Sequence, residues 1–282
     1  MKITFAKTAI DSAPKGYLRV RFIEEPKGTK RFVREDGAEW LELGIGKAKD
    51  LTNRKFTILI RSMVQAAKQQ NARKVAVTFT ATPKLWENLS FSSEELRGQV
   101  FAENVVMANF EFRTFKTKPK DGWKDVEEIL ICDAATPAMR AGIKKGLLVG
   151  EAVNAARELS NTPGGSMTPK GLAKAAKAAV AGLPVTVQTL DRAALTKLGM
   201  GLLAGVGAGS SDDPTFTVMT YKGGKPSEKP IVLAGKGITF DSGGLKIKPS
   251  SSIYEMHLDM SGAASVIHAV ALAAQLKLKK NV

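Results

Sequence analysis

Two hydrophobic periods alternate along the first half of the chain, one typical of strands and the other typical of helices. Apolar residues at helical spacing predict helices over 55–70 and 92–110, the second with Ser92 or Ser93 as its N-cap. Runs rich in β-branched and aromatic residues predict strands at 17–23, 74–80 and 128–133. Strands that alternate with helices indicate an α/β domain with a mixed or parallel sheet.

A long helical pattern marks the middle of the chain. It begins after Pro137 and ends near Ser160, where the sequence N-T-P-G-G interrupts it. We interpret this segment as a connector between two domains. The predicted organisation is an N-terminal α/β domain over 1–136, a linker helix and junction over 137–165, and a second α/β domain over 166–282.

The second domain repeats the alternation. Thr168 is the predicted N-cap of a helix with Pro169 in its first turn. Further helices are predicted at 191–199 and 260–276, and strands at 185–190, 215–221 and 229–235. The last of these strands, K-P-I-V-L-A-G, is almost continuously apolar, which predicts a central position in a sheet.

Composition places the protein among ordinary globular chains. Of the 282 residues, 44% are apolar and 24% charged, and no stretch approaches the roughly 20 apolar residues of a membrane span. The N-terminus lacks the apolar core of a secretion signal. The single cysteine, Cys132, excludes an internal disulfide framework, and we expect it to be a small buried hydrophobic residue in a cytoplasmic protein.

The formal net charge of +15 is the one unusual feature of the composition. Such a charge suits an anionic partner, and DNA is one candidate. The basic residues are scattered rather than gathered in a block, and no helix-turn-helix or zinc-ligand pattern accompanies them. We therefore interpret the charge first as a solvated surface that keeps the protein soluble, and a DNA-binding or regulatory protein stays as the alternative.

Candidate chemistry begins at the end of the strand predicted over 229–235. The loop G-K-G-I-T-F-D-S-G-G-L-K-I-K-P-S carries Lys236, Asp241 and Lys248, and Asp259 follows it. Ligands bind at the carboxyl ends of strands in open α/β sheets, and carboxylates accept divalent cations. The spacing therefore suggests a metal site, although Asp259 could instead lie at the N-terminus of its helix.

This region resembles the signature of the leucyl aminopeptidase (cytosol aminopeptidase) family, bacterial type. The resemblance rests on V-L-A-G-K-G-I-T-F-D-S-G-G-L-K-I-K-P-S followed by M-H-L-D-M-S-G-A-A-S-V. The residues at the family's spacings are Lys236, Thr239, Asp241, Gly243, Gly244, Lys248 and Asp259. The resemblance implies a macro-like N-terminal α/β domain and an α/β catalytic domain with a mixed sheet.

The resemblance also implies roles and partners. Lys236, Asp241 and Asp259 would bind two divalent ions (Mn²⁺, Zn²⁺ or Mg²⁺), with Asp241 bridging them. Lys248 would stabilise the oxyanion of the reaction, and Met256 would line the pocket for the first side chain of a peptide substrate. Family members form hexamers, so a homo-oligomer is expected, and no membrane partner is.

Part of the family's site has no counterpart in the sequence. A segment resembling N-T-D-A-E-G-R, which would supply two more metal ligands and the arginine of a bicarbonate site, does not occur before Val282. We therefore expect an incomplete catalytic domain with little or no peptidase activity by itself, and no bicarbonate site. A non-catalytic short form is the alternative. His257 and His268 are expected to be structural.

Overall fold

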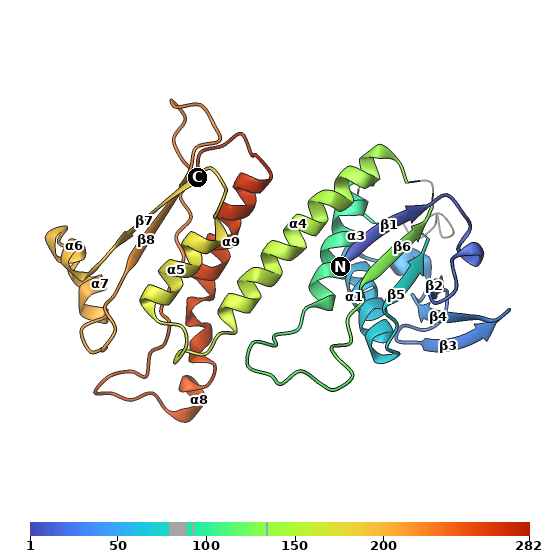
Figure 1. Ribbon diagram of the computed structural model, residues 1–282, viewed down its shortest axis with the longest axis horizontal. Helices are drawn as coiled ribbons and strands as arrows, with labels where there is room; N and C mark the ends of the chain where they lie inside the picture. Colours follow the sequence, from blue (N-terminus) through green and yellow to red (C-terminus); the bar gives the residue numbers. More distant parts are fainter. Residues whose placement is uncertain (79–88, 92, 134) are drawn as a thin grey trace. The chain divides into compact units, whose positions relative to one another are not determined.

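The computed structural model describes residues 1–78, 89–91, 93–133 and 135–282 as two compact units, Met1–Glu151 and Ala152–Val282 (Figure 1). The division lies within the long helix α4, Pro137–Ser160, which is the predicted connector helix. Both units mix strands and helices, so the predicted α/β class is confirmed. No helix of the described residues is long and apolar enough to cross a membrane.

The first unit is built on a six-stranded sheet with the order β1-β6-β5-β2-β4-β3. Its strands are β1 (Lys2–Ala6), β2 (Leu18–Ile23), β3 (Lys30–Glu35), β4 (Ala38–Gly44), β5 (Lys74–Val77) and β6 (Glu128–Cys132). Every neighbouring pair is parallel except β3 and β4, which are antiparallel. The helices α1 (Asn53–Gln69) and α3 (Glu94–Asn109) complete this unit with the first part of α4.

Side-chain alternation along the central strands assigns the two faces of this sheet. Ile129 and Ile131 of β6 belong to the large core that α1 and α3 also form, whereas Leu130 and Cys132 pack in a smaller cluster with Ala13. Successive side chains of a strand point to opposite faces of the sheet, so these two clusters cover both faces of β6. Cys132 is free and buried as predicted, and burial raises the pKa of its thiol.

Helix starts agree closely with the sequence patterns. The Ser93 hydroxyl accepts a hydrogen bond from the N–H of Leu96 and caps α3. Ser92, the other candidate for this cap, lies outside the described residues.

The strands agree less well with the sequence patterns. Residues 79 and 80, at the end of the predicted strand 74–80, lie outside the described residues. The predicted strand at 17–23 is β2. Three further strands, β1, β3 and β4, were not predicted. Of these, β3 is a charged edge strand, K-R-F-V-R-E, whose polarity hides its pairing.

The second unit contains a two-stranded antiparallel sheet and several helices. Its elements are α5 (Pro169–Ala179), β7 (Val185–Leu190), α6 (Arg192–Lys197), α7 (Gly201–Val206), β8 (Phe216–Tyr221), α8 (Ser250–Ile253), the 3-10 helix η3 (Met256–Met260) and α9 (Ser261–Gln275). Thr168 caps α5 through the N–H of Gly171, as predicted. Helices α5 and α9 pack together through Leu172, Ala176, Ala264 and Ile267.

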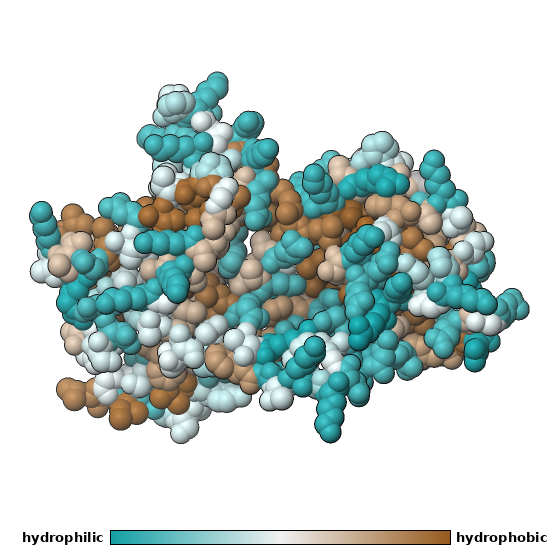
Figure 2. Space-filling view, in the orientation of Figure 1, coloured by the Kyte–Doolittle hydropathy of each residue, from teal (hydrophilic) through white to brown (hydrophobic). Residues whose placement is uncertain are grey.

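The predicted central strand over 229–235 is wrong. These residues have no strand assignment, and the side chains of Ile231, Val232 and Leu233 are 51%, 82% and 43% exposed. A backbone hydrogen bond joins this segment to the chain end, from the N–H of Ile231 to the carbonyl of Asn281. A strand requires neighbours on its edges, and an apolar pattern alone does not supply them. Figure 2 shows apolar residues at the surface of this unit.

His268 on α9 gives this unit a predicted dependence on pH. Burial lowers the pKa of its imidazole below the usual value near 6.5. The unfolded chain then binds the proton more readily, so the free energy of unfolding should fall as the pH drops below about 6.5, by at most about 1.4 kcal/mol per pH unit. Urea unfolding between pH 5 and 7.5 measures this slope. Equal slopes for the wild type and His268→Gln would contradict the prediction.

Candidate functional site

Close backbone contacts fix the loop that carries Lys236 against the start of α9. A Cβ atom on Gly235 would lie 2.6 Å from the carbonyl oxygen of Gly262, and one on Gly262 would lie 2.9 Å from the nitrogen of Lys236. The N–H of Ala263 also donates to the carbonyl of Lys236 at 2.8 Å. Two glycines that face each other therefore let the loop approach the helix closely enough to position Lys236.

The turn that follows orients Asp241. Its carboxylate Oδ1 accepts the N–H of Gly243 at 2.8 Å, and the N–H of Lys248 donates to the carbonyl of Ser242 at 2.9 Å. Gly243 has φ +97°, and a Cβ atom there would lie 3.0 Å from the nitrogen of Lys248. Only glycine fits this turn without strain, and the turn brings Lys248 back to Asp241.

Two lysines and two aspartates form two ion pairs. Lys236 Nζ lies 3.1 Å from Asp259 Oδ2, and Lys248 Nζ lies 2.8 Å from Asp241 Oδ2. The hydrogen bond from Lys248 is the largest cause of a lowered pKa at Asp241, followed by the N–H of Gly243, with a smaller electrostatic contribution from Lys236. The loop and the 3-10 helix η3, which carries Asp259, thus bring together all four residues that the sequence singled out.

Met256 lies beside the second pair. Its sulfur is 3.5 Å from Lys248 Nζ, at the beginning of η3. The preceding residue, Glu255, has φ +61°, a left-handed conformation that redirects the chain between α8 and η3. This local turn places Met256 and Asp259 on the same short helix, three residues apart, so that each contacts one lysine.

The donor set fits part of a metal site. Two ligands about 2.1 Å from one cation at a right angle are about 3 Å apart, which is close to the 3.1 Å between Lys236 Nζ and Asp259 Oδ2. Lys236 can act as a ligand only as a neutral amine, and a nearby cation favours loss of its proton. In the described ranges, no three side chains of His, Cys, Asp and Glu gather as a metal-binding group. One amine and two carboxylates are few ligands for two cations.

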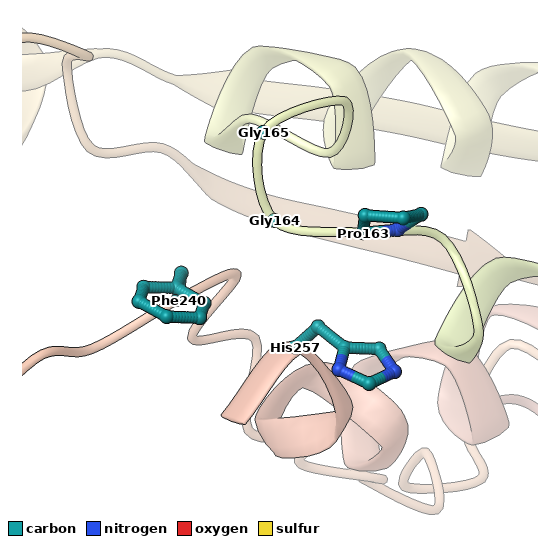
Figure 3. Close-up of a pocket in the computed structure, with 5 residues that line it drawn as sticks. All are labelled: Pro163, Gly164, Gly165, Phe240 and His257. Carbon is teal, nitrogen blue, oxygen red and sulfur yellow. The ribbon is translucent and has the colours of Figure 1, made fainter. Parts of the chain in front are cut away.

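A mainly apolar pocket of about 640 Å³ has Phe240, the residue before Asp241, in its wall (Figure 3). It is lined by Phe240, His257 and the loop Pro163–Gly165, and a Cβ atom on Gly164 would lie 2.9 Å from the Phe240 ring. His257, predicted to be structural, contributes its side chain to this wall. The sequence offered no signal for the pocket, because Pro163 and Phe240 are far apart along the chain.

The chain is similar in sequence to a known family of proteins. The model of the cytosol aminopeptidase family, catalytic domain, matches residues 154–282. A probable cytosol aminopeptidase from Aromatoleum aromaticum is 36% identical over 248 residues, covering 86% of this chain and 48% of that protein. The chain belongs to the cytosol aminopeptidase family. It spans about half the length of the curated relatives that it matches.

Solved structures of two other proteins share the fold. The bottromycin maturation enzyme BotP in complex with Mn is 27% identical, with a TM-score of 0.76 over 94% of this chain and 57% of that one. The K354E mutant of tomato leucine aminopeptidase superposes with a TM-score of 0.80 over 99% of this chain and 60% of that one, at 23% identity. The α/β architecture of this family member is therefore that of the leucine aminopeptidases.

Proposed function

We propose that this family member provides the metal-binding loop of a two-metal leucyl aminopeptidase, which releases N-terminal residues from peptides. The observation that supports the proposal most strongly is the 3.1 Å approach of Lys236 Nζ to Asp259 Oδ2, with Asp241 held on the adjacent turn. An amine and two carboxylates on one loop and one helix start are a donor set for divalent cations such as Mn²⁺ or Zn²⁺.

Each residue has a separate role in the proposed reaction. Lys236 and Asp259 would hold one cation, and Asp241 would bridge it to a second. Bound divalent ions would supply a hydroxide near neutral pH and polarise the scissile carbonyl. Lys248, whose ammonium lies 2.8 Å from Asp241, would place a positive charge where the oxyanion develops. Met256, in contact with Lys248, would line the pocket for the substrate's first side chain.

The proposals for substrate, location and assembly rest on the family to which the chain belongs. Peptides are the proposed substrates, the cytoplasm the proposed location, and a homo-hexamer the proposed assembly. We further propose that hydrolysis needs ligands beyond Lys236, Asp241 and Asp259, because three donors do not fill the coordination of two cations. The activity of these 282 residues alone is therefore expected to be very low.

Hydrolysis of leucine p-nitroanilide tests this proposal. The chain, with its mass verified, is assayed in the presence of Mn²⁺. We expect its hydrolysis rate to be no higher than that of the Asp241→Asn variant, which serves as the inactive control. A robust rate that Lys248→Met lowers by about 100-fold or more would overturn the need for further ligands and retain the aminopeptidase assignment. A robust rate that both variants leave unchanged would overturn the assignment of the site itself.

A further inference from the structure

A second cavity lies in the first unit, at the carboxyl ends of two parallel strands. It has a volume of about 560 Å³ and adjoins the chain just after β4, which ends at Gly44, and after β2, which ends at Ile23. Ligands bind at this edge of open α/β sheets. The polar side chains that line it are those of Lys27, Lys47, Lys49, Asp50, Thr52 and Lys55.

Positive charge dominates this cavity. Four lysines face a single carboxylate, so the lining carries an excess of three positive charges. Lys55 Nζ donates to the backbone carbonyl of Asp50 at 2.6 Å, a bond that leaves the lysine's charge unneutralised. Over the described parts of the chain, none of the four ammonium groups forms an ion pair with a carboxylate. Asp50 is the single carboxylate of the lining, so most of the positive charge has no counterion within the cavity.

Two of these lysines repel each other directly. The proximity of Lys55, as a hydrogen-bonding and like-charged neighbour, is the main cause of a lowered pKa at Lys27. By contrast, Arg21 in the same unit bonds both Glu35 and Glu42. An anion bound between Lys27 and Lys55 would relieve the repulsion that the protein leaves in place.

The backbone turn at Gly46 packs against one of these lysines. Gly46 has φ +74°, and a Cβ atom there would lie 3.6 Å from Cγ of Lys27, against whose side chain the turn packs. Directly beyond the cavity the 17-residue helix α1 begins at Asn53, with Thr52 as its N-cap. The positive end of its dipole adds to the lysine charges but does not define the site by itself.

We propose that this cavity binds a compact anion with two linked phosphate groups, either free pyrophosphate or the diphosphate of a nucleotide. All four lysines line one cavity of about 560 Å³, a size that favours a small ligand over a nucleic-acid backbone. Two phosphate groups match the excess of three positive charges, whereas a single phosphate leaves part of it uncompensated. The site lies in the first unit, and the proposal is independent of the aminopeptidase assignment.

Titration calorimetry with sodium pyrophosphate at about 50 mM salt tests the proposal. Lys27→Met and Lys55→Met should each weaken binding at least tenfold, and the double variant should abolish it. Lys118→Met, which removes an exposed lysine from outside the cavity, should change the affinity less than twofold. Because Lys55 also contacts the backbone, circular dichroism and thermal unfolding without ligand must match the wild type, and Lys27→Arg should retain binding.

Further ligands separate the sources of the phosphate. Binding of ADP with at least the affinity of pyrophosphate would indicate a nucleotide, and preference for pyrophosphate would indicate the free anion. Equal affinities for pyrophosphate and sulfate, or equal losses in the Lys27 and Lys118 variants, would overturn the proposal. A lack of any binding at 5 mM pyrophosphate would also overturn it. The same holds if duplex DNA binds through Lys27 and Lys55 and pyrophosphate does not compete with it.

Discussion

Replacing Lys236 by methionine or Asp259 by asparagine should weaken Mn²⁺ binding to the chain by at least tenfold. The two side chains lie 3.1 Å apart, so each variant removes one of two adjacent donors to the same proposed cation. Asp241→Asn should have an effect of similar size, because it removes a charged donor from the turn beside them. Electron paramagnetic resonance of free Mn²⁺ during titration measures the affinity of each variant.

Two neighbouring lysines supply the controls for this prediction. Lys246→Met removes an exposed charge from the same loop and should leave Mn²⁺ affinity within about threefold of the wild type. Lys248→Met should do the same or strengthen binding, since it frees Asp241 from a 2.8 Å ion pair. A tenfold loss in Lys246→Met, or none in Asp259→Asn, would show that the cation binds elsewhere.

Replacing Gly146 by alanine should destabilise the first unit by about 2 kcal/mol or more. Gly142, Gly146 and Gly150 lie one turn apart along α4 and contact α3. A Cβ atom on Gly146 would contact the backbone carbonyl of Gln99 and lie 2.9 Å from Cβ of Ala102. The backbone of a packed helix cannot move aside at low cost, so the two helices would have to separate.

Gly205 in α7 provides the matched control. A Cβ atom there meets no other atom within 4 Å, so Gly205→Ala should be neutral or stabilise the chain by up to about 1 kcal/mol. Guanidinium unfolding followed by circular dichroism compares the two variants. If Gly146→Ala were as stable as Gly205→Ala, the close contact between α3 and α4 would not exist in solution.

Local signals in the sequence were sufficient for most helices. Thr168 followed by Pro169 defines the start of α5, and Ser93 the start of α3, because a side chain caps the first turn from within a few residues. The same holds for the loop around Asp241, where Gly243 is required by a positive φ. The resemblance of this loop to a known family therefore named the four residues that the fold brings together.

Strand pairing could not be predicted from local patterns. The apolar run over 229–235 resembled a central strand, but within the part of the chain that the structure describes it pairs with no strand, and it remains exposed. Conversely, β3 is polar and was overlooked, although it pairs with β4 along its whole length. Whether a segment becomes a strand depends on a partner that is distant in sequence, and hydrophobicity does not report that partner.

The sequence by itself singled out Lys236, Asp241, Lys248 and Asp259 as the candidate site residues, because their spacing resembles the signature of an enzyme family. Only the tertiary structure decided how they combine, with Lys236 beside Asp259 and Lys248 beside Asp241. The first pair depends on the close approach of Gly235 to Gly262, and the second on the turn at Gly243. The lysine cavity near Lys27 and Lys55 is likewise a product of folding. Side chains far apart in sequence meet only when strand order and helix packing place them together.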